Sequence, residues 1–598
     1  MAHSSILDLF LGNAEQFPTR TAALYKKDGG YREIDWRTLA DQAQALSAAL
    51  VALGVAPGDR VALLSQTRLE WVVADMGILG AGATTVPIYA SNLPDECQYI
   101  IENSGAVVAI TEDAAQTQKI ERERGRLPGL KKIIQLDGEL GDPDDFVLSY
   151  AKLGALPPVA AAELGRRRAA LSADSILTLI YTSGTTGRPK GVILTHDCML
   201  YEAEAVRAID ILEETDVQLF FLPLAHSFAK VLEIAWIATH SVLAFAESMQ
   251  TIRDNLREVQ PTIMCGVPRV FEKFYGAIAT KGTAAGGAKA ALFNAAATMS
   301  SHHGEAVAKG ERLPFAERLQ YAALKRLVFA KVARGLKETL GGRMRGIISG
   351  GAPLSPRIAW FFRDAGVEVL EGYGLTETSA ATFVNRPGHN RIGTVGPAMP
   401  GTEVRIAADG EVLVKGRGVM RGYWNNKAAT DEVLKDGWFQ TGDIGVLDAA
   451  GHLKITDRKK DIIVTAGGKN VAPQNIENLL KTHKLVSQVV VHGDKRKFVS
   501  AIVTLDPDAL KALAVERRLG ELSYAELSQK PEVYAAVQEA IDAVNTTLPS
   551  YETIKKFKIL EHDFSQESGE MTPSLKVKRK VVAERYKAIF DGFYDESH

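Results

Sequence analysis

The sequence predicts an α/β protein with largely parallel strands, because helix-like and strand-like segments alternate from its start. In TLADQAQALSAALVALG (38–54), Leu and Ala recur at helical spacing and Gly54 ends the run. A turn and a short apolar run, RVALLS (60–65), follow, and the same order recurs in VVADMGILGAGATTVPI (72–88). This rhythm is typical of parallel strands joined by helices.

Length and composition indicate a globular enzyme with more than one core. A chain of 598 residues usually forms two or more domains. The formal net charge of −2 gives no global field for nucleic acid, so we expect no nucleic-acid partner. Cys97, Cys198 and Cys265 lie far apart without metal-ligand spacing, which favours a reduced, cytoplasmic location.

Neither a signal peptide nor a membrane span is expected. The N-terminus lacks a basic segment followed by a long apolar core. The most apolar region, VLEIAWIATHSVLAFA (231–246), is too short to cross a bilayer and carries Glu233 and His240. We expect this region to form buried helix and strand.

Residues 276–345 differ from the rest of the chain and predict a helical insertion. They hold 12 basic and 4 acidic residues, a local net charge of +8. The stretch 314–342 is long enough for one helix that Gly341 and Gly342 would close. A solvated surface insertion and a surface that contacts anionic lipid or coenzyme A phosphates both remain open.

A change of texture after TDRKKDIIV (456–464) predicts a domain boundary, because shorter units with many charges follow it. We therefore expect an N-terminal domain over 1–456, a hinge over 457–460 and a small C-terminal domain over 461–598.

The loop in YTSGTTGRPKGV (181–192) has the composition of a phosphate-binding loop. Apolar runs flank it on both sides, so it predicts a hairpin between two strands and not a Walker loop that opens a helix. Glycines permit close backbone approach, hydroxyls donate hydrogen bonds, and a lysine suits phosphate oxygens. A plain Gly/Thr-rich surface hairpin is the alternative. The candidate residues are Thr182, Ser183, Gly184, Thr185, Thr186, Gly187 and Lys190.

Further motifs follow this loop in a fixed order, and the whole set resembles the adenylate-forming superfamily of acyl-CoA synthetases, adenylation domains and luciferases. The resemblance runs from about residue 20 to 585, and the segment 436–461 with the insertion before GGAPL resembles long-chain fatty acyl-CoA synthetases most. The motifs are GIISGGAPLS (346–355), VEVLEGYGLTETS (367–379), DGWFQTGDIGVL (436–447), LKITDRKKDIIVTAGGKNVAP (453–473) and MTPSLKVKRK (571–580).

The resemblance implies a fold and a reaction. The fold is α/β: a large N-terminal domain of two stacked α/β subdomains plus a β-barrel-like subdomain, with a small mobile α+β C-terminal domain. In the reaction, a fatty acid attacks the α-phosphate of ATP, giving acyl-AMP and pyrophosphate, and the thiol of coenzyme A then displaces AMP. The first step sets a carboxylate against a polyanion, so it needs cations, hydrogen-bond donors and Mg²⁺.

The resemblance also assigns nucleotide contacts. The loop 182–190 would hold the β- and γ-phosphates, Thr376 would contact phosphate, and Glu377 would bind Mg²⁺, since a hard cation prefers carboxylate oxygen. Asp443 would bind the ribose hydroxyls and Arg458 the ribose or phosphate. An adenine site would be formed by the stacking ring of Tyr373 with Gly350, Gly351, Ala352, Glu371, Gly372 and Gly374.

Lys576 is the catalytic candidate, because the family spaces its lysine three residues before an arginine, here Arg579. It would bridge the carboxylate and the α-phosphate; Lys578 and Lys580 are the alternatives. His226 in PLAHSF would lie near the acyl carboxylate and the thiol path, although a histidine that only packs a helix is nearly as good an interpretation.

The resemblance also implies a hinge at Asp457 and Lys460. Rotation of the C-terminal domain there would bring Lys576 to the site in one pose and the coenzyme A side, Gly467, Gly468 and Lys469, in the other. The apolar segments 220–240 and 264–276 would line the acyl chain. A fatty acyl-AMP ligase, a medium-chain or aryl-CoA ligase and a non-catalytic lipid- or nucleotide-binding homologue are the alternative functions. Peripheral membrane contact through the basic insertion and a homodimer remain open.

Overall fold

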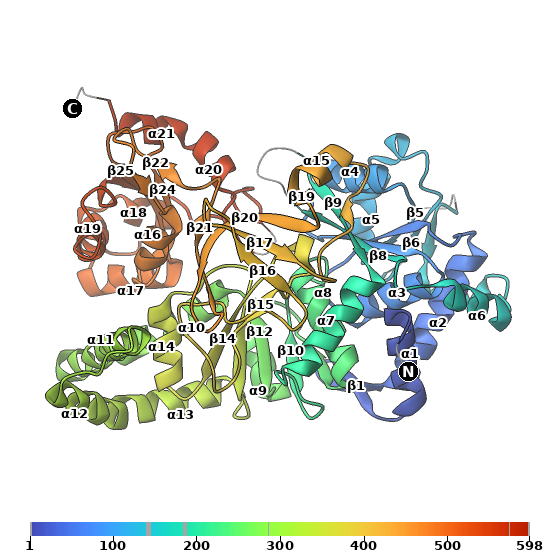
Figure 1. Cartoon of the computed structure of the whole chain (residues 1–598), viewed down its shortest axis with the longest axis horizontal. Helices are drawn as coiled ribbons and strands as arrows, with labels where there is room; N and C mark the ends of the chain where they lie inside the picture. The colour runs from blue at the N-terminus through green and yellow to red at the C-terminus, as the bar shows by residue number, and fades with distance from the viewer. Residues whose placement is uncertain (1–2, 139–144, 183–187, 285, 573–574, 596–598) are drawn as a thin grey trace.

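The computed structural model describes residues 3–138, 145–182, 188–284, 286–572 and 575–595 and contains two large sheets (Figure 1). The first takes most of its strands from residues 60–195. Its centre is parallel, and antiparallel strands close one edge. In spatial order the strands are β18 (Gly422–Tyr423), β9 (Lys190–Thr195), β8 (Ile176–Thr182), β4 (Thr84–Ile88), β3 (Arg60–Leu64), β5 (Ala106–Thr111), β6 (Lys132–Gln135) and β7 (Val147–Ser149).

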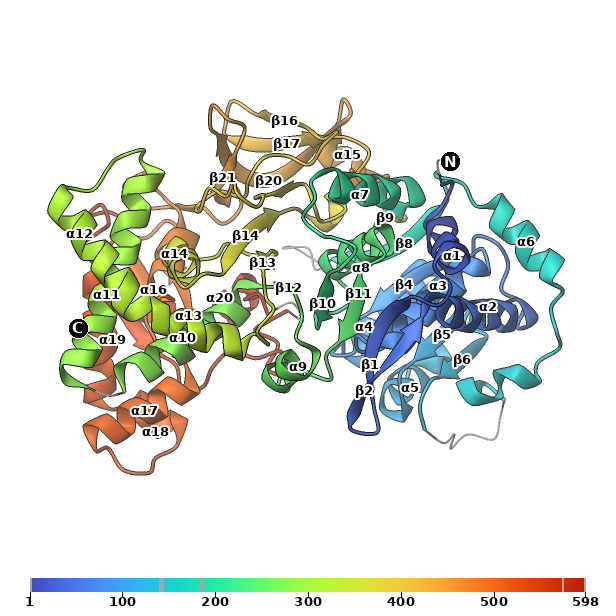
Figure 2. The ribbon, with the colours of Figure 1, turned by 90° about the horizontal axis from the view of Figure 1, so that it is seen from below.

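The second large sheet lies between the first sheet and the C-terminal end of the chain (Figure 2). Six of its strands run parallel, with an antiparallel strand at either edge. In order they are β15 (Phe383–Val384), β14 (Glu368–Tyr373), β13 (Gly346–Ser349), β12 (Ile263–Gly266), β10 (Val217–Phe220), β11 (Val242–Phe245), β1 (Thr21–Lys27) and β2 (Gly30–Asp35).

Helices pack on both sheets, and one core joins the two halves. The predicted helix 38–54 is α2 (Trp36–Ala52), capped by the side chain of Asp35. It packs against α3 (Leu69–Gly80) so closely that a Cβ on Gly80 would lie 2.2 Å from Ser47 Oγ. The other helices of these halves are α1 (Ile6–Gln16), α4 (Pro94–Ser104), α5 (Ala114–Glu121), α6 (Ala161–Ala170), α7 (His196–Ala208), α8 (Ser227–Thr239), α9 (Ile252–Val259) and α14 (Pro356–Asp364).

A small antiparallel sheet follows, and a separate α+β unit ends the chain. Strands β22 to β26 and helices α16 to α21 form what we call the C-terminal unit, which has its own core. The small sheet contains β16 (Glu403–Ile406), β17 (Glu411–Lys415), β19 (Leu434–Lys435), β20 (Trp438–Leu447) and β21 (Leu453–Arg458), with α15 (Lys427–Val433) beside it. The C-terminal unit contains β22 (Ile463–Val464), β23 (Asn470–Val471), β24 (Val486–His492), β25 (Val499–Leu505), β26 (Ile554–Ile559), α16 (Pro473–Leu480), α17 (Pro507–Arg517), α18 (Tyr524–Ser528), α19 (Pro531–Asn545), α20 (Arg579–Arg585) and α21 (Lys587–Gly592).

This arrangement confirms the predicted fold class, with two α/β halves, a third small β unit and an α+β C-terminal unit. The apolar region 231–246 is buried and divides between α8 and β11, as expected. Within the described residues no helix is both long and apolar enough to cross a membrane.

The basic segment 276–345 is helical, but its second half is not one regular helix. The helices are α10 (Pro268–Thr283), α11 (Gly287–Ala308), α12 (Phe315–Leu324) and α13 (Ala330–Thr339), with a π-helical turn over Lys325–Phe329 between the last two. Leu324 and Phe329 are both buried although they are five residues apart. An α-helix would point them to different sides, whereas the wider π turn aligns such a pair.

Candidate active site

The carboxyl ends of the parallel strands β13 and β14 form the floor of the candidate site. Parallel strands end at one edge of a sheet, where ligands of such folds bind. The Gly350 N–H donates to Gly266 O at 3.0 Å, which continues the sheet into the predicted adenine segment. Glu371 accepts a hydrogen bond from the Leu354 N–H at 3.0 Å, and burial raises the pKa of this carboxyl to about 7.

Gly374 has a steric reason to be glycine that is independent of nucleotide. A Cβ at this position would lie 1.9 Å from Ala380 O, so no other residue fits the turn. Gly372 lies beside the edge strand β15, with which it pairs at Val384. Close backbone contacts thus hold the chain on both sides of the Tyr373 ring, through strand pairing at Gly372 and the approach of Ala380 O at Gly374.

Tyr373, Asp443 and Arg458 form a connected group above this floor. The Tyr373 hydroxyl donates to Asp443 Oδ2 at 2.6 Å, and Arg458 Nε donates to Oδ1 at 2.9 Å. Asp443 and Arg458 are direct partners in the β20–β21 register, which explains their contact across 15 residues. Burial, and next the Asp443 charge, raise the pKa of Tyr373 well above its usual value, so the phenol stays protonated.

The turn that carries Thr376 and Glu377 lies between the two large sheets. Thr376 Oγ1 lies 3.0 Å from Ser227 Oγ at the start of α8. The Tyr423 hydroxyl donates to Glu377 Oε1 at 2.8 Å, and Lys190 Nζ lies 4.9 Å from the centre of the Tyr423 ring. Tyr423 thus connects the predicted metal ligand to the end of the phosphate loop.

Sequence reasoning missed Tyr423, because it belongs to none of the motifs. It reaches Glu377 through the antiparallel pairing of β18 with β9, and this pairing has no signal in the sequence alone. The predicted β8–β9 hairpin is confirmed, and Thr182 pairs with Lys190 next to the connecting loop. Ser183, Gly184, Thr185, Thr186 and Gly187 lie outside the described residues.

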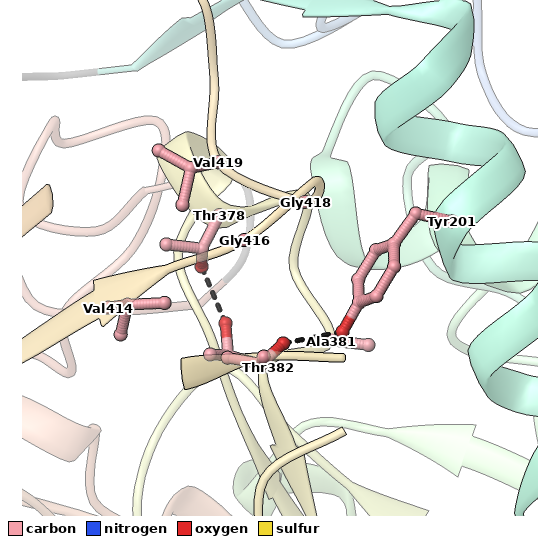
Figure 3. A pocket seen from close by; sticks show the side chains of 9 residues that line it. Tyr201, Thr378, Ala381, Thr382, Val414, Gly416, Gly418 and Val419 are labelled. Atoms are coloured by element: carbon pink, nitrogen blue, oxygen red, sulfur yellow. Dashed lines mark hydrogen bonds between the residues drawn. The ribbon is translucent and has the colours of Figure 1, made fainter. Parts of the chain in front are cut away.

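A small pocket lies behind the Thr376–Glu377 turn (Figure 3). Thr382 donates to Thr378 at 2.7 Å across it, and the Tyr201 hydroxyl lies on its other side. Its volume of about 10 Å³ suits one water molecule at most, so it is no substrate site.

Lys576 reaches from the C-terminal unit to the nucleotide residues. A Cβ built on Gly351 would lie 3.8 Å from Lys576 Cε and 4.0 Å from Nζ. The side chain keeps some exposure to solvent, but partial desolvation of its ammonium by the surrounding protein, and next the Arg458 charge, lower the pKa of Lys576 to about 8, whereas Asp443 and Glu377 act in the opposite direction. The structure therefore brings Lys576 together with the site residues of the distant motifs.

Arg579 explains the spacing of the lysine motif. Its guanidinium donates to Glu477 Oε2 at 2.6 Å and to Val491 O at 3.3 Å, which fixes the start of α20. The alternative candidate Lys580 pairs with Glu584 on α20 at 3.9 Å, and Lys578 occupies the N-cap position of α20 without a side-chain cap. Lys576, by contrast, extends to Gly351 in the predicted adenine segment.

The lowered pKa of Lys576 predicts that its bridging of the carboxylate and the α-phosphate, the role that the resemblance implies, depends on pH. The free enzyme holds the charge below about pH 8 and loses it as the pH rises through that value. We expect kcat/KM for acyl-AMP formation to fall above about pH 8. Lys576→Arg should move this fall to higher pH, because arginine remains charged; an unchanged profile in this variant would assign the fall to another group.

His226 caps α8, where its Nδ1 accepts the Phe228 N–H at 3.1 Å. Burial, and next the Lys576 charge, lower its pKa to about 3, so the ring is neutral near pH 7. With Nδ1 engaged as an acceptor, the proton is on Nε2. The geometry thus gives His226 a structural role as a cap and leaves Nε2–H as a donor.

The predicted hinge residues lie at the end of β21 and just after it, and the predicted coenzyme A residues lie in the C-terminal unit. Asp457 is buried, accepts the Arg458 N–H at 2.6 Å and has a pKa that burial raises to about 6. Lys460 is exposed in the turn after β21. Gly467, Gly468 and Lys469 form an exposed turn between β22 and β23.

Comparison with known proteins agrees with this geometry, and the chain belongs to the AMP-binding enzyme family. The model of that family matches residues 10–424, and the model of the AMP-binding enzyme C-terminal domain matches residues 460–598. The resemblance predicted from the motifs is therefore confirmed.

Two curated relatives illustrate the part of the family that this chain resembles. Long-chain-fatty-acid–CoA ligase FadD15 of Mycobacterium bovis is 39% identical over 95% of this chain and 93% of that protein. Long-chain-fatty-acid–CoA ligase ACSBG2 of Xenopus laevis is 31% identical over 99% of this chain and 84% of that protein.

Solved structures share the fold at low identity. The anthranilate CoA ligase AuaEII in complex with anthranoyl-AMP has a TM-score of 0.75 at 22% identity, and the alignment covers 99% of each chain. The A domain of carboxylic acid reductase from Segniliparus rugosus, in complex with AMP, has a TM-score of 0.76 at 20% identity over 100% of this chain and 95% of that chain.

Proposed function

We propose that this protein is a long-chain-fatty-acid–CoA ligase that forms acyl-AMP from a fatty acid and ATP and then transfers the acyl group to coenzyme A. The observation that carries the proposal is the approach of Lys576 to Gly351, beside Asp443, Arg458 and Glu377. The names of the relatives support the long-chain substrate.

Lys576 would act in the first half-reaction as a cation between two anions. Its ammonium would contact the fatty acid carboxylate and the α-phosphate, which offsets their repulsion and fixes the line of attack. Asp443 would hold the ribose hydroxyls, and the Tyr373 ring would stack on adenine. Thr376 and the loop around Lys190 would donate to the phosphates and stabilise the leaving pyrophosphate.

Glu377 fits a Mg²⁺ ion that arrives with ATP. Its Oε2 has no hydrogen-bond partner among the described residues, whereas Oε1 accepts from Tyr423. Among the residues that the structure describes, no three or more His, Cys, Asp or Glu side chains cluster so that they could hold a metal by themselves. Mg²⁺ commonly uses one or two carboxylates and takes its other ligands from phosphates and water. When bound, it would neutralise phosphate charge.

Aromatic side chains next to the site support an apolar acyl pocket. A Cβ on Gly266 would lie 3.0 Å from the Phe271 ring and 3.2 Å from the Phe221 ring, and one on Gly350 would lie 3.0 Å from the Phe228 ring. At about 0.8 kcal/mol per buried methylene, a palmitoyl chain could contribute on the order of 10 kcal/mol. The wall predicted over 220–240 and 264–276 thus includes rings beside the adenine floor.

An acyl-chain series tests the proposed substrate. Pyrophosphate and thioester are measured with acids from C6 to C20 and with benzoate, and we expect both products to be greatest with long chains. A fatty acyl-AMP ligase would release pyrophosphate without thioester, a medium-chain or aryl-CoA ligase would prefer the short acids or benzoate, and a non-catalytic homologue would give neither product.

Alternation between the half-reactions would use the turn at Lys460. The C-terminal unit would rotate there, replacing Lys576 by the Gly467–Lys469 turn at the entrance for coenzyme A. Lys460→Pro fixes φ, so we expect the thioester step to fall about tenfold and adenylation to change less. Lys460→Ala, which leaves φ free, is the control. Equal loss of both steps in the proline variant would argue against a selective hinge.

The basic insertion supports peripheral contact with an anionic membrane by a protein otherwise located in the cytoplasm. Phe315, Leu319 and Leu327 are 73%, 57% and 58% exposed. The exposed residues Arg318 and Arg326 lie on the same helical stretch. Apolar side chains among basic ones are typical of helices that lie on anionic bilayers.

Vesicle co-sedimentation tests this contact. We expect Arg318→Glu/Leu319→Ser to lose binding to phosphatidylglycerol vesicles, with unchanged activity toward a dissolved medium-chain acid. Lys511→Glu/Val515→Ser on α17 removes an exposed basic and apolar pair from the C-terminal unit and is the matched control. Equal vesicle binding by both variants would exclude the insertion as the membrane contact. The homodimer stays a prediction for light scattering to test.

A further inference from the structure

Arg269 makes a polar contact between the two parts of the molecule. It is the second residue of α10, in the N-terminal part, and its guanidinium donates to Ser487 O at 3.1 Å and to Ser487 Oγ at 2.6 Å in β24. Its Nη2 also lies 3.6 Å from Asp563 Oδ2, and Nη1 lies 3.9 Å from Glu272 Oε2. These are charge-assisted contacts between segments more than 200 residues apart.

Asp563 is held in place on its own side of this contact. Ser487 Oγ donates to Asp563 Oδ2 at 2.5 Å, and Thr504 Oγ1 donates to Oδ1 at 2.6 Å. The side chains of Arg269 and Asp563 are only 15% and 24% exposed, so solvent screens the pair less than it screens a surface ion pair.

The contact lies next to the place where Lys576 enters the site. Val267, two residues before Arg269, has its Cγ1 3.7 Å from a Cβ built on Gly351, and Lys576 Cε lies 3.8 Å from the same point. On the other side, Phe564 follows Asp563 and shares a core with Leu575, the neighbour of Lys576. Residues next to the contact on both sides, Val267 and Phe564, therefore pack near Lys576 or its neighbour Leu575.

From this geometry we infer that Arg269 is a positioning residue that holds the C-terminal unit in the pose for acyl-AMP formation. The inference rests on the proposed two-step function. The latch, defined as Arg269, Ser487 and Asp563, must open if the unit rotates for the thioester step. Its loss should therefore lower the population of the first pose without removing any group that contacts substrate.

Half-reactions measured separately test the latch. Adenylation is followed as pyrophosphate release without coenzyme A, and the thioester step starts from supplied acyl-AMP and coenzyme A. We expect Arg269→Ala to lower adenylation roughly tenfold and to leave the thioester step unchanged or faster, because activity follows the fraction of competent pose. Arg269→Lys keeps the charge and should lose less. Arg391→Ala, which breaks the Arg391–Asp448 pair within the N-terminal part, is the control.

A distance measurement that needs no activity separates this inference from the proposed function. Spin labels at Leu93→Cys and Val515→Cys report the distance between the two parts; both positions are exposed, and the three native cysteines are buried. We expect Arg269→Ala to broaden or shift the distance distribution. An unchanged distribution, or equal loss in both half-reactions, would overturn the latch. Failure of the wild type to form acyl-AMP would overturn the proposed function instead.

Discussion

Lys576→Ala is expected to lower the rate of acyl-AMP formation about 10²- to 10³-fold, the size of effect found when one preorganised electrostatic group is removed from an active site. The ammonium lies beside Gly351, and its pKa responds to Arg458, Asp443 and Glu377. Single-turnover pyrophosphate release measures this step. Hydrolysis or thioester formation from supplied acyl-AMP should fall far less, because the bond from the carboxylate to the α-phosphate has already formed and the bond to pyrophosphate has already broken.

Neighbouring lysines provide matched controls for this prediction. Lys578→Ala and Lys580→Ala remove the same charge from the same motif; Lys578 lies at the N-cap position of α20, and Lys580 pairs with Glu584 on that helix. Full adenylation by Lys576→Ala, or an equal loss in Lys580→Ala, would contradict the assignment.

Glu377→Gln is the second large effect, with an expected loss of about 100-fold in adenylation at low Mg²⁺. The amide keeps the shape of the side chain and can still accept a hydrogen bond from the Tyr423 hydroxyl, but it lacks the charge that a hard cation prefers. A magnesium titration of the rate should show a higher half-saturating concentration and a lower plateau.

Tyr423→Phe separates metal binding from support of the carboxylate. It removes only the hydrogen bond to Glu377 Oε1, worth about 1.5 kcal/mol or more when the acceptor is charged, so we expect a loss of about tenfold. If Glu377→Gln kept the wild-type magnesium dependence, Glu377 would not be the metal ligand, whatever the effect of Tyr423→Phe.

Much of the fold followed from local pattern. Alternating helix and strand signals predicted the parallel sheets, and the apolar runs around 181–192 predicted the β8–β9 hairpin. The motif residues Asp443, Arg458 and Lys576 lie together as the family resemblance implied, and their roles stay predictions. Short-range chemistry of this kind is readable because each motif contains its own turn or strand end.

Contacts that depend on the tertiary arrangement could not be predicted. Tyr423 reaches Glu377 only because β18 adds to β9, and Arg269 meets Ser487 only because the C-terminal unit docks on the rest of the molecule. The π turn at Lys325–Phe329 arises from which side chains the rest of the molecule buries, and not from helix propensity. Gly374 was assigned to nucleotide contact, whereas the approach of Ala380 O already requires a glycine there.

A rapid-quench experiment with a carboxyl-labelled long-chain fatty acid and ATP tests the central claim most directly. The account predicts one equivalent of enzyme-bound acyl-AMP with one equivalent of pyrophosphate in the absence of coenzyme A. On addition of coenzyme A, the same label should move into thioester with release of AMP. Formation of ADP and phosphate instead, or acyl-AMP that coenzyme A does not consume, would contradict it.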